Sequence, residues 1–108
     1  MIHVIAVITA KPGLRDQVLE AFWANREAVL AEKGCIEYGA TVDAAGMPAS
    51  KGSFGPDTFV VVERWETRED LNAHGKAPHM KVWREYSAPL KVSPTVIEII
   101  SDGKVEKF

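Results

Sequence analysis

Residues that can exchange protons or bind a planar molecule gather between Glu63 and His74. A histidine with its ordinary pKa of about 6.5 suits proton transfer at neutral pH, so His74 is our first candidate for a general base. Trp65 offers a flat apolar surface and an N–H donor. Glu63 shares a predicted strand face with Trp65, where a carboxylate needs a partner, and it could pair with His74 or with an arginine. These three residues form the candidate catalytic set.

A second group of candidates would bind the substrate rather than react with it. A planar molecule is well held by rings, and the candidates are aromatic or carry an imidazole: Phe22, Tyr38, His79, Trp83 and Tyr86. Each candidate also has a purely structural interpretation. Aromatic side chains often pack in the core, and a lone histidine often caps the end of a helix with its ring. Since Pro78 interrupts the helix pattern between His74 and His79, spacing alone does not decide whether the two rings converge.

Several classes of site do not fit the residues present. Three histidines and one cysteine, Cys35, offer neither His-Glu-x-x-His nor Cys-x-x-Cys spacing, so we expect no metal site and no internal disulfide. The glycine-rich stretch over residues 50–55 lacks the residue order of a phosphate-binding loop. We interpret it as a flap over a pocket mouth.

The composition is that of one folded domain. The chain has 108 residues, and we treat residues 1–108 as a single domain. Hydrophobic residues make up 46% and charged residues 26%, as in an ordinary globular protein. A net charge of −2 gives no bulk attraction to nucleic acid or to an anionic membrane. The apolar residues 1–10 lack a cationic leader segment and are too short to span a membrane, so we expect a strand there and a cytoplasmic protein.

Four strands and three helical segments must position the candidate residues. Apolar residues alternate in the strands, which are predicted over residues 2–10, 36–43, 58–66 and 95–101. They recur every three to four residues in the helices, which are predicted over residues 14–33, 68–76 and 79–91. The order β-α-β-β-α-β, with the last two helical segments taken as one unit, is that of an α+β ferredoxin-like fold. Such a fold has a four-stranded antiparallel sheet with its helices on one face.

Local sequence features mark the ends of these elements. Gly34 follows the last apolar repeat of the first helix, as a left-handed helix stop would. Thr67 and Asp70 match a capping box, in which each side chain bonds the backbone N–H of the other residue. Pro78 suits the first turn of a helix. Residues 44–57 are rich in glycine and proline, so we predict a loop there.

The predicted sheet is apolar on both faces. In the first strand, Ile5 and Val7 point away from the face that carries Val4 and Ala6. The helices can cover one face only, and a single chain has no further element for the other. We therefore predict a homodimer in which two sheets pack face to face.

The segment from Phe59 to Met80 resembles the antibiotic biosynthesis monooxygenase family. The family pattern there is a strand ending in Glu-x-Trp, a capped helix with a Leu-x-Ala-His run and a following Pro-His pair, present as Glu63, Trp65, Leu71, Ala73, His74, Pro78 and His79. A second family feature, Gly-Cys-x-x-Tyr, stands at residues 34–38. The resemblance follows nearly the whole chain in element order and is closest over residues 34–38 and 59–80. The loop over residues 44–56 is longer than is usual in the family.

This resemblance implies a dimeric α/β barrel with a substrate pocket between the sheet and the helices of each protomer. It also implies an oxygenase that needs neither a metal nor a flavin. Family members of this type oxidise quinols and polyketide anthrones with O2. We therefore expect a cofactor-independent monooxygenase of a small aromatic, quinol-like or phenol-like substrate.

Two positions depart from particular branches of the family. Polyketide oxygenases often carry an amide side chain four residues before the strand tryptophan, where this chain has Val61. Relatives that degrade haem use an asparagine on the first strand and an axial histidine in the last helix. The first strand here has no asparagine, and the matching helix position is Arg84, so the resemblance does not extend to haem binding.

Two other functions fit the same residues. His74 and His79 could act as an acid–base pair in an isomerase or lyase of a small polar metabolite. The chain could also be a dimer that binds a small molecule without catalysis. A pocket rich in lysine and arginine would favour the isomerase, and an aromatic pocket would favour the oxygenase.

Overall fold

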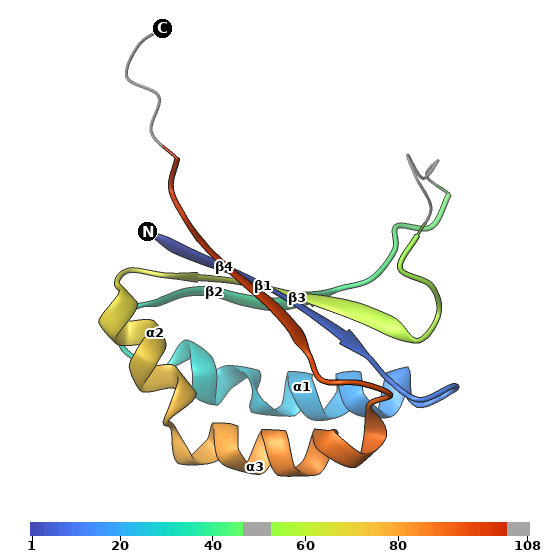
Figure 1. The fold of residues 1–108 in the computed structure, drawn as a ribbon. Coiled ribbons are helices and arrows are strands. Elements are labelled where there is room, and N and C mark those ends of the chain that lie inside the picture. Colours follow the sequence, from blue (N-terminus) through green and yellow to red (C-terminus); the bar gives the residue numbers. More distant parts are fainter. Residues whose placement is uncertain (47–52, 104–108) are drawn as a thin grey trace, which may run out of the picture.

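The fold is a single sheet with helices on one side. The computed structural model describes residues 1–46 and 53–103. In these residues β1 (Ile2–Thr9), β2 (Cys35–Thr41), β3 (Thr58–Trp65) and β4 (Val96–Ser101) form an antiparallel sheet in the order β2-β3-β1-β4. Helices α1 (Arg15–Leu30), α2 (Arg68–Gly75) and α3 (Pro78–Ser87) cover one face of this sheet (Figure 1). The predicted α+β ferredoxin-like fold is confirmed.

Most element boundaries lie within a few residues of the prediction, and α1 is one of the helices that end earlier than predicted. It ends at Leu30 rather than Lys33. The Ala31 N–H still bonds the Glu27 carbonyl, but the Glu32 N–H bonds the Val29 carbonyl, which tightens the last turn and ends the helix. Gly34 then adopts a φ of +79°, the left-handed conformation expected for it.

The second helical region divides at Pro78, as predicted. Pro78 is the first residue of α3, where its missing N–H costs no helical hydrogen bond. Pro89 lies in a short 3₁₀ helix, η1 (Ala88–Leu90), which follows α3. The predicted helix to Lys91 therefore ends early, because proline disrupts α-helical hydrogen bonding.

The core lies between the sheet and α1. Phe22, Val18 and Val29 of α1 are buried against Phe59 and Trp65 of β3. This is the helix stripe and the strand face that the sequence predicts. Because α1 packs mainly against β2, with some contact to β3, the edge strand β4 is left largely uncovered and its residues are exposed.

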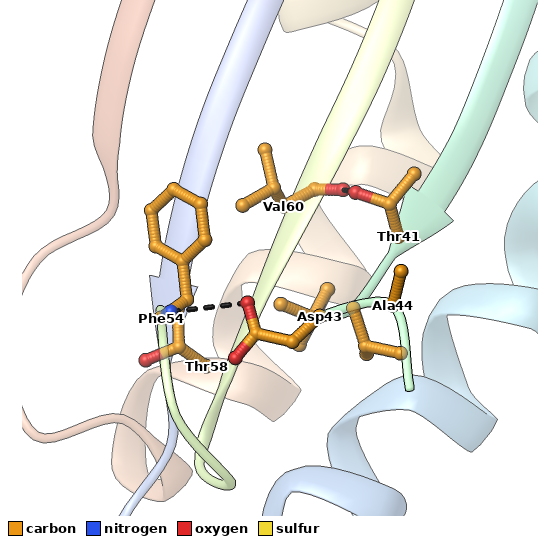
Figure 2. Close-up of a pocket in the computed structure, with 8 residues that line it drawn as sticks. Thr41, Asp43, Ala44, Phe54, Thr58 and Val60 are labelled. Carbon is orange, nitrogen blue, oxygen red and sulfur yellow. Dashed lines mark hydrogen bonds between the residues drawn. The ribbon is translucent and has the colours of Figure 1, made fainter. Parts of the chain in front are cut away.

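The opposite, helix-free face of the sheet is apolar and open in the single chain. Ile5 is 38% exposed, and Val96 and Ile100 of β4 are 56% and 50% exposed. Phe54 also lies over this face, near Val60 (Figure 2). The Asp43 carboxylate holds this part of the loop by accepting hydrogen bonds from the N–H groups of Phe54, at 3.0 Å, and Gly55, at 2.9 Å.

The predicted loop over residues 44–57 lies partly outside the described residues, which omit 47–52. The flap interpretation of residues 50–55 falls largely on this gap and stays a prediction. No helix among residues 1–46 and 53–103 has both the length and the apolar character needed to cross a membrane.

Gly34 provides a test of how α1 is tied to α2. A Cβ atom at Gly34 would overlap the carboxylate of Asp70, and its φ of +79° is unfavourable for other residues. Gly13 has nearly the same φ, +80°, but a Cβ there would meet nothing within 4 Å. We expect Gly13→Ala to cost about 1 kcal/mol of unfolding free energy and Gly34→Ala to cost roughly twice that or more. Urea denaturation measures both losses, and equal losses would show that the Asp70 contact is unimportant.

Candidate active site

A cavity of about 550 Å³ lies between the sheet and the helices α2 and α3. A volume of this size accommodates a small organic molecule. Its walls are mainly apolar, with side chains from β1, β3 and β4 below and from α2 and α3 above. The rings of Phe22, Tyr38 and Trp83 contribute an aromatic section.

His74 is placed at this cavity by a well-formed start of α2. The Thr67 hydroxyl accepts a hydrogen bond from the Asp70 N–H at 3.0 Å, which confirms one half of the predicted capping box. The Asp70 side chain lies against Gly34 and so contributes to the junction with the end of α1. The helix then brings the His74 ring, 5% exposed, to the cavity wall.

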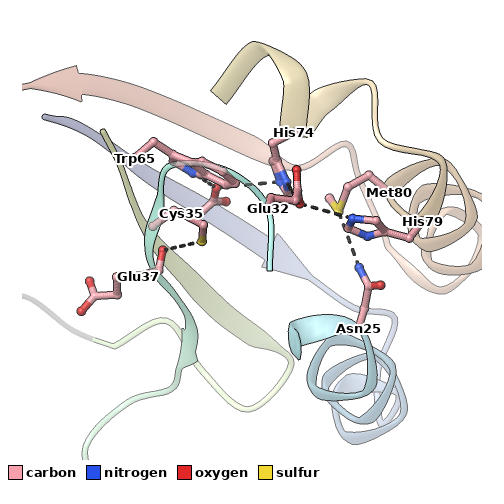
Figure 3. Close-up of polar contacts among 9 residues, drawn as sticks. Asn25, Glu32, Cys35, Glu37, Trp65, His74, His79 and Met80 are labelled. Carbon is pink, nitrogen blue, oxygen red and sulfur yellow. Dashed lines mark hydrogen bonds and ion pairs between the residues drawn. The ribbon is translucent and has the colours of Figure 1, made fainter. Parts of the chain in front are cut away.

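Glu32 connects the two histidines. Its Oε2 lies 2.8 Å from His74 Nδ1 and 3.3 Å from His79 Nε2 (Figure 3). A carboxylate can only accept hydrogen bonds, so the short contact requires a proton on His74 Nδ1. In the neutral ring Nε2 is then the free acceptor. Glu32 therefore fixes the tautomer of His74.

Glu63 lies on the other side of the His74 ring. Its Oε1 accepts a hydrogen bond from Trp65 Nε1 at 2.9 Å and lies 4.0 Å from His74 Nε2. Burial raises the pKa of Glu63, and repulsion from Glu32 acts in the same direction. The Trp65 hydrogen bond and the charge of His74 oppose this rise. The carboxyl group is therefore a better proton acceptor than an exposed glutamate would be.

The aromatic rings form a connected wall. The ring of Tyr38 stacks on that of Phe22, with centroids 4.9 Å apart, and meets the ring of His74 edge-on at 5.6 Å. Trp83 contacts Phe22 at 6.0 Å. Burial and the neighbouring Glu63 raise the pKa of Tyr38, so its hydroxyl is protonated at neutral pH and can donate a hydrogen bond in the cavity.

The structure brings together most, but not all, of the predicted site residues. Five of them line the cavity: Phe22, Tyr38, Glu63, His74 and Trp83. Trp65 is fully buried behind the wall, and its N–H already bonds Glu63, so it positions Glu63 instead of offering a free stacking face. Its ring packs against that of His74, with centroids 4.7 Å apart.

His79 and Tyr86 lie elsewhere. Both border a second, more open cavity of about 300 Å³ between α1 and α3, which Trp83 also lines. The Tyr86 hydroxyl accepts a hydrogen bond from Gln17 at 3.3 Å. His79 reaches the His74 site only through Glu32.

Sequence reasoning missed Glu32. The helix pattern places this residue on the polar side of the first helix, which is the ordinary position of an exposed glutamate. Its contact with His74 depends on how the end of α1 is positioned relative to α2. The spacing of residues within either helix does not predict that relative position. The residue has only 16% of its side chain exposed.

Cys35 lies close to the same carboxylates. Burial, together with repulsion from Glu32 and Glu63, raises the pKa of its thiol to about 11. Cys35 is therefore a protonated thiol at neutral pH and not a nucleophile. Across residues 1–46 and 53–103, no group of three histidine, cysteine, aspartate or glutamate side chains is arranged to hold a metal ion.

Comparison with known proteins identifies the family. The family model described as "Antibiotic biosynthesis monooxygenase" matches residues 1–86. The chain belongs to the antibiotic biosynthesis monooxygenase family. It is 43% identical over 88 residues to the "Probable quinol monooxygenase YgiN" of Escherichia coli K12, a match that covers 79% of this chain and 83% of that relative.

Solved structures similar to this member of the antibiotic biosynthesis monooxygenase family share its fold. Rv0793 from Mycobacterium tuberculosis superposes with a TM-score of 0.78 at 23% identity, over 98% of each chain. A conserved protein from Methanosarcina mazei Go1 gives a TM-score of 0.81 at 22% identity, over 94% of this chain and 92% of that one. The recognition of the family from residues 34–38 and 59–80 is thus confirmed.

The raised pKa of Glu63 predicts how stability depends on pH in this family member. The folded state keeps the Glu63 proton to a higher pH than the unfolded chain does, so ionisation lowers stability as pH rises through that interval. Glu63→Gln retains an oxygen for the Trp65 N–H but removes the charge. We expect the variant to be more stable than the wild type near neutral pH, with the difference shrinking as the pH falls towards about 4.3, the ordinary pKa of glutamate.

Urea denaturation at several pH values measures this difference. Glu66→Gln, at an exposed position beside the end of β3, is the matched control and should show no such trend. A Glu63→Gln variant that is less stable than the wild type at neutral pH would contradict the assignment of a costly buried charge.

Proposed function

We propose that this protein is a cofactor-independent monooxygenase that oxidises a small hydroxyaromatic substrate, quinol-like or phenol-like, with O2. The observation that carries the proposal is His74, a buried imidazole whose Nδ1 is held by Glu32 at the wall of an apolar, aromatic cavity. The family membership and the name of the Escherichia coli relative support the same chemistry.

The first step is removal of the substrate's hydroxyl proton. His74 Nε2 accepts this proton, which leaves an aryloxide in the cavity and an imidazolium beside Glu32. The Glu32 carboxylate stabilises the imidazolium through the 2.8 Å contact with Nδ1. Glu63, 4.0 Å from Nε2, adds negative charge on the other side of the ring.

The second step uses the electron-rich aryloxide. It gives one electron to O2, and the resulting aryloxyl radical and superoxide combine at a ring carbon. The imidazolium protonates this peroxide, His74 then removes the proton from the same ring carbon, and the O–O bond breaks. One oxygen atom becomes a quinone carbonyl and the other leaves as water, so hydroxyarene and O2 give quinone and water. The dry walls protect the radical pair from solvent.

The cavity favours this function over the isomerase alternative. An acid–base pair needs both histidines at one substrate, whereas His79 borders the second cavity and touches the first only through Glu32. Val61 is buried and lines the main cavity, so it supplies no hydrogen bond of the kind associated with polyketide oxygenases. A quinol-like or phenol-like substrate is therefore better supported than an anthrone.

Oxygen uptake tests the proposal. Metal-stripped protein is supplied with a panel of quinols and naphthols, in the presence of catalase and with correction for autoxidation. We expect saturable uptake that yields quinone, and a loss of about 10²–10⁴-fold in kcat/KM for His74→Ala, which lacks the base. Glu32→Gln should lose less and shift the pH profile, while Glu69→Gln, on the exposed side of α2, should behave as the wild type. Uptake no faster than the protein-free blank over the whole panel would refute the function.

We also propose that the protein is a homodimer joined through the helix-free face. A single chain leaves apolar residues of β1 and β4 exposed there, together with Phe54. Burying such a patch is favourable at roughly 25 cal/mol per Å² of apolar surface. The substrate site lies on the opposite side of the sheet and remains accessible in this arrangement.

Light scattering coupled to size exclusion tests the dimer. We expect a mass near twice the 11.9 kDa of the chain for the wild type, and a monomer for Ile5→Lys, which places a charge in the apolar face. Val82→Lys changes an exposed apolar residue on α3 instead and should stay dimeric. A single species of chain mass for the wild type at micromolar concentration would exclude this dimer.

A further inference from the structure

Three cationic side chains border the main cavity, although they come from separate segments. Lys76 follows α2, Arg84 lies in the last turn of α3, and Lys91 follows η1. None of them forms a salt bridge with a carboxylate in the described part of the chain. Lys91 Nζ instead donates to Thr95 Oγ1 at 2.9 Å, and Thr95 also lines the cavity.

This distribution contrasts with the rest of the molecule. The chain as a whole carries a net charge of −2, so an excess of cations around one cavity is not a general property of the surface. Among the described residues that line the cavity, Glu63 is the one carboxylate, and it lies beside His74. The cations that line this cavity therefore outnumber its carboxylates, and the one carboxylate lies beside His74.

The sheet register shows that Lys91 lies far from Glu63 and His74. Glu63 pairs with Val4, and Val4 pairs with Ile99. Thr95, the partner of Lys91, precedes the start of β4, four residues before Ile99, and Lys91 itself bridges to Ala10 after β1. Four residues of strand correspond to about 13 Å. Arg84 lies in the last turn of α3, which leads into η1 and Lys91, and it lines the same cavity.

We propose that the substrate is a hydroxyaromatic carboxylate, with its hydroxyl group at His74 and its carboxylate at Arg84 and Lys91. This inference rests on the proposed function for the role of the hydroxyl group. The planar guanidinium of Arg84 matches a carboxylate, and Lys91 adds a second charge. The apolar section between the two ends receives the ring system, and Arg84 and Lys91 determine specificity without taking part in the oxidation.

The combination also accounts for the mixed character of the cavity. Aromatic walls alone would suit a neutral quinol, and a cationic pocket alone would suit a small polar metabolite. An aromatic ring that carries an acid uses both parts. Arg84 has another conceivable role, since a cation in the last turn of a helix stabilises it through the helix dipole. That role affects folding but not the choice between acidic and neutral ligands.

The test compares two ligands of matched ring size, 6-hydroxy-2-naphthoic acid and 2-naphthol. Calorimetric binding is measured without O2, so that no turnover is needed. We expect the wild type to bind the acid about ten-fold more tightly than the naphthol. Arg84→Gln should remove most of this preference and leave naphthol binding unchanged. Lys81→Gln makes the same charge change on the side of α3 away from the cavity, where Lys81 pairs with Glu85, and should retain the preference.

The outcomes separate this inference from the proposed function. Preferential binding of the acid that depends on Arg84, with no oxygen consumption for this acid or for any member of the quinol and naphthol panel, would support the carboxylate site and refute the oxygenase. Equal binding of both ligands by the wild type would overturn the inference, whatever the oxygenase activity. Equal losses for Arg84→Gln and Lys81→Gln would also overturn it, because they would indicate bulk charge alone. Thermal melts of both variants show whether Arg84 contributes only to helix stability.

Discussion

The hydrogen bond between Glu32 and His74 is the interaction on which the rest of the site depends. It joins the turn after α1 to the last turn of α2, two segments that are far apart in sequence. A buried imidazole can serve as a base only if one nitrogen is held and the other is free, and Glu32 Oε2 imposes that state through Nδ1. The close packing of Gly34 against Asp70 keeps the two segments near enough for the contact.

Burying carboxylates in this environment costs free energy, because they lose contact with water, and several neighbouring groups reduce that cost. Glu63 is only 8% exposed and faces a largely apolar cavity, which disfavours its charged form. The Trp65 N–H and the nearby His74 reduce that penalty without removing it. Glu32 lies closer to the surface, with 16% of its side chain exposed, and its carboxylate is shared by His74 and His79.

The sequence predicts best those features that local backbone physics decides. Gly34, Thr67 and Pro78 mark element ends because each responds to its own backbone conformation or to neighbours within one turn. Alternation along β3 places Glu63 and Trp65 on one face, which is why their mutual hydrogen bond could have been anticipated. Glu32 could not be found in this way, because its partner comes from an element that meets α1 only in the folded chain. The same non-local geometry separates His79 from the cavity of His74. The two histidines are only five positions apart in the sequence, and this short spacing alone would suggest a shared site.

The cofactor-independent oxidation proposed for this protein places strict demands on it, because the substrate itself must supply the electrons. The protein contributes a base, a dry cavity and a fixed orientation for the ring. Orientation is the hardest of these to obtain in an apolar cavity, since dispersion contacts are not directional. A charged group at the far end of the substrate would supply direction, because an ion pair near Arg84 fixes which end of the ring system reaches His74. The cations Arg84 and Lys91 and the hydrogen-bonded His74 thus serve one purpose, which is to orient the substrate. The strand β4 begins just after Thr95, the partner of Lys91, and ends beside the start of β1, so it separates Lys91 from the His74 end of the cavity.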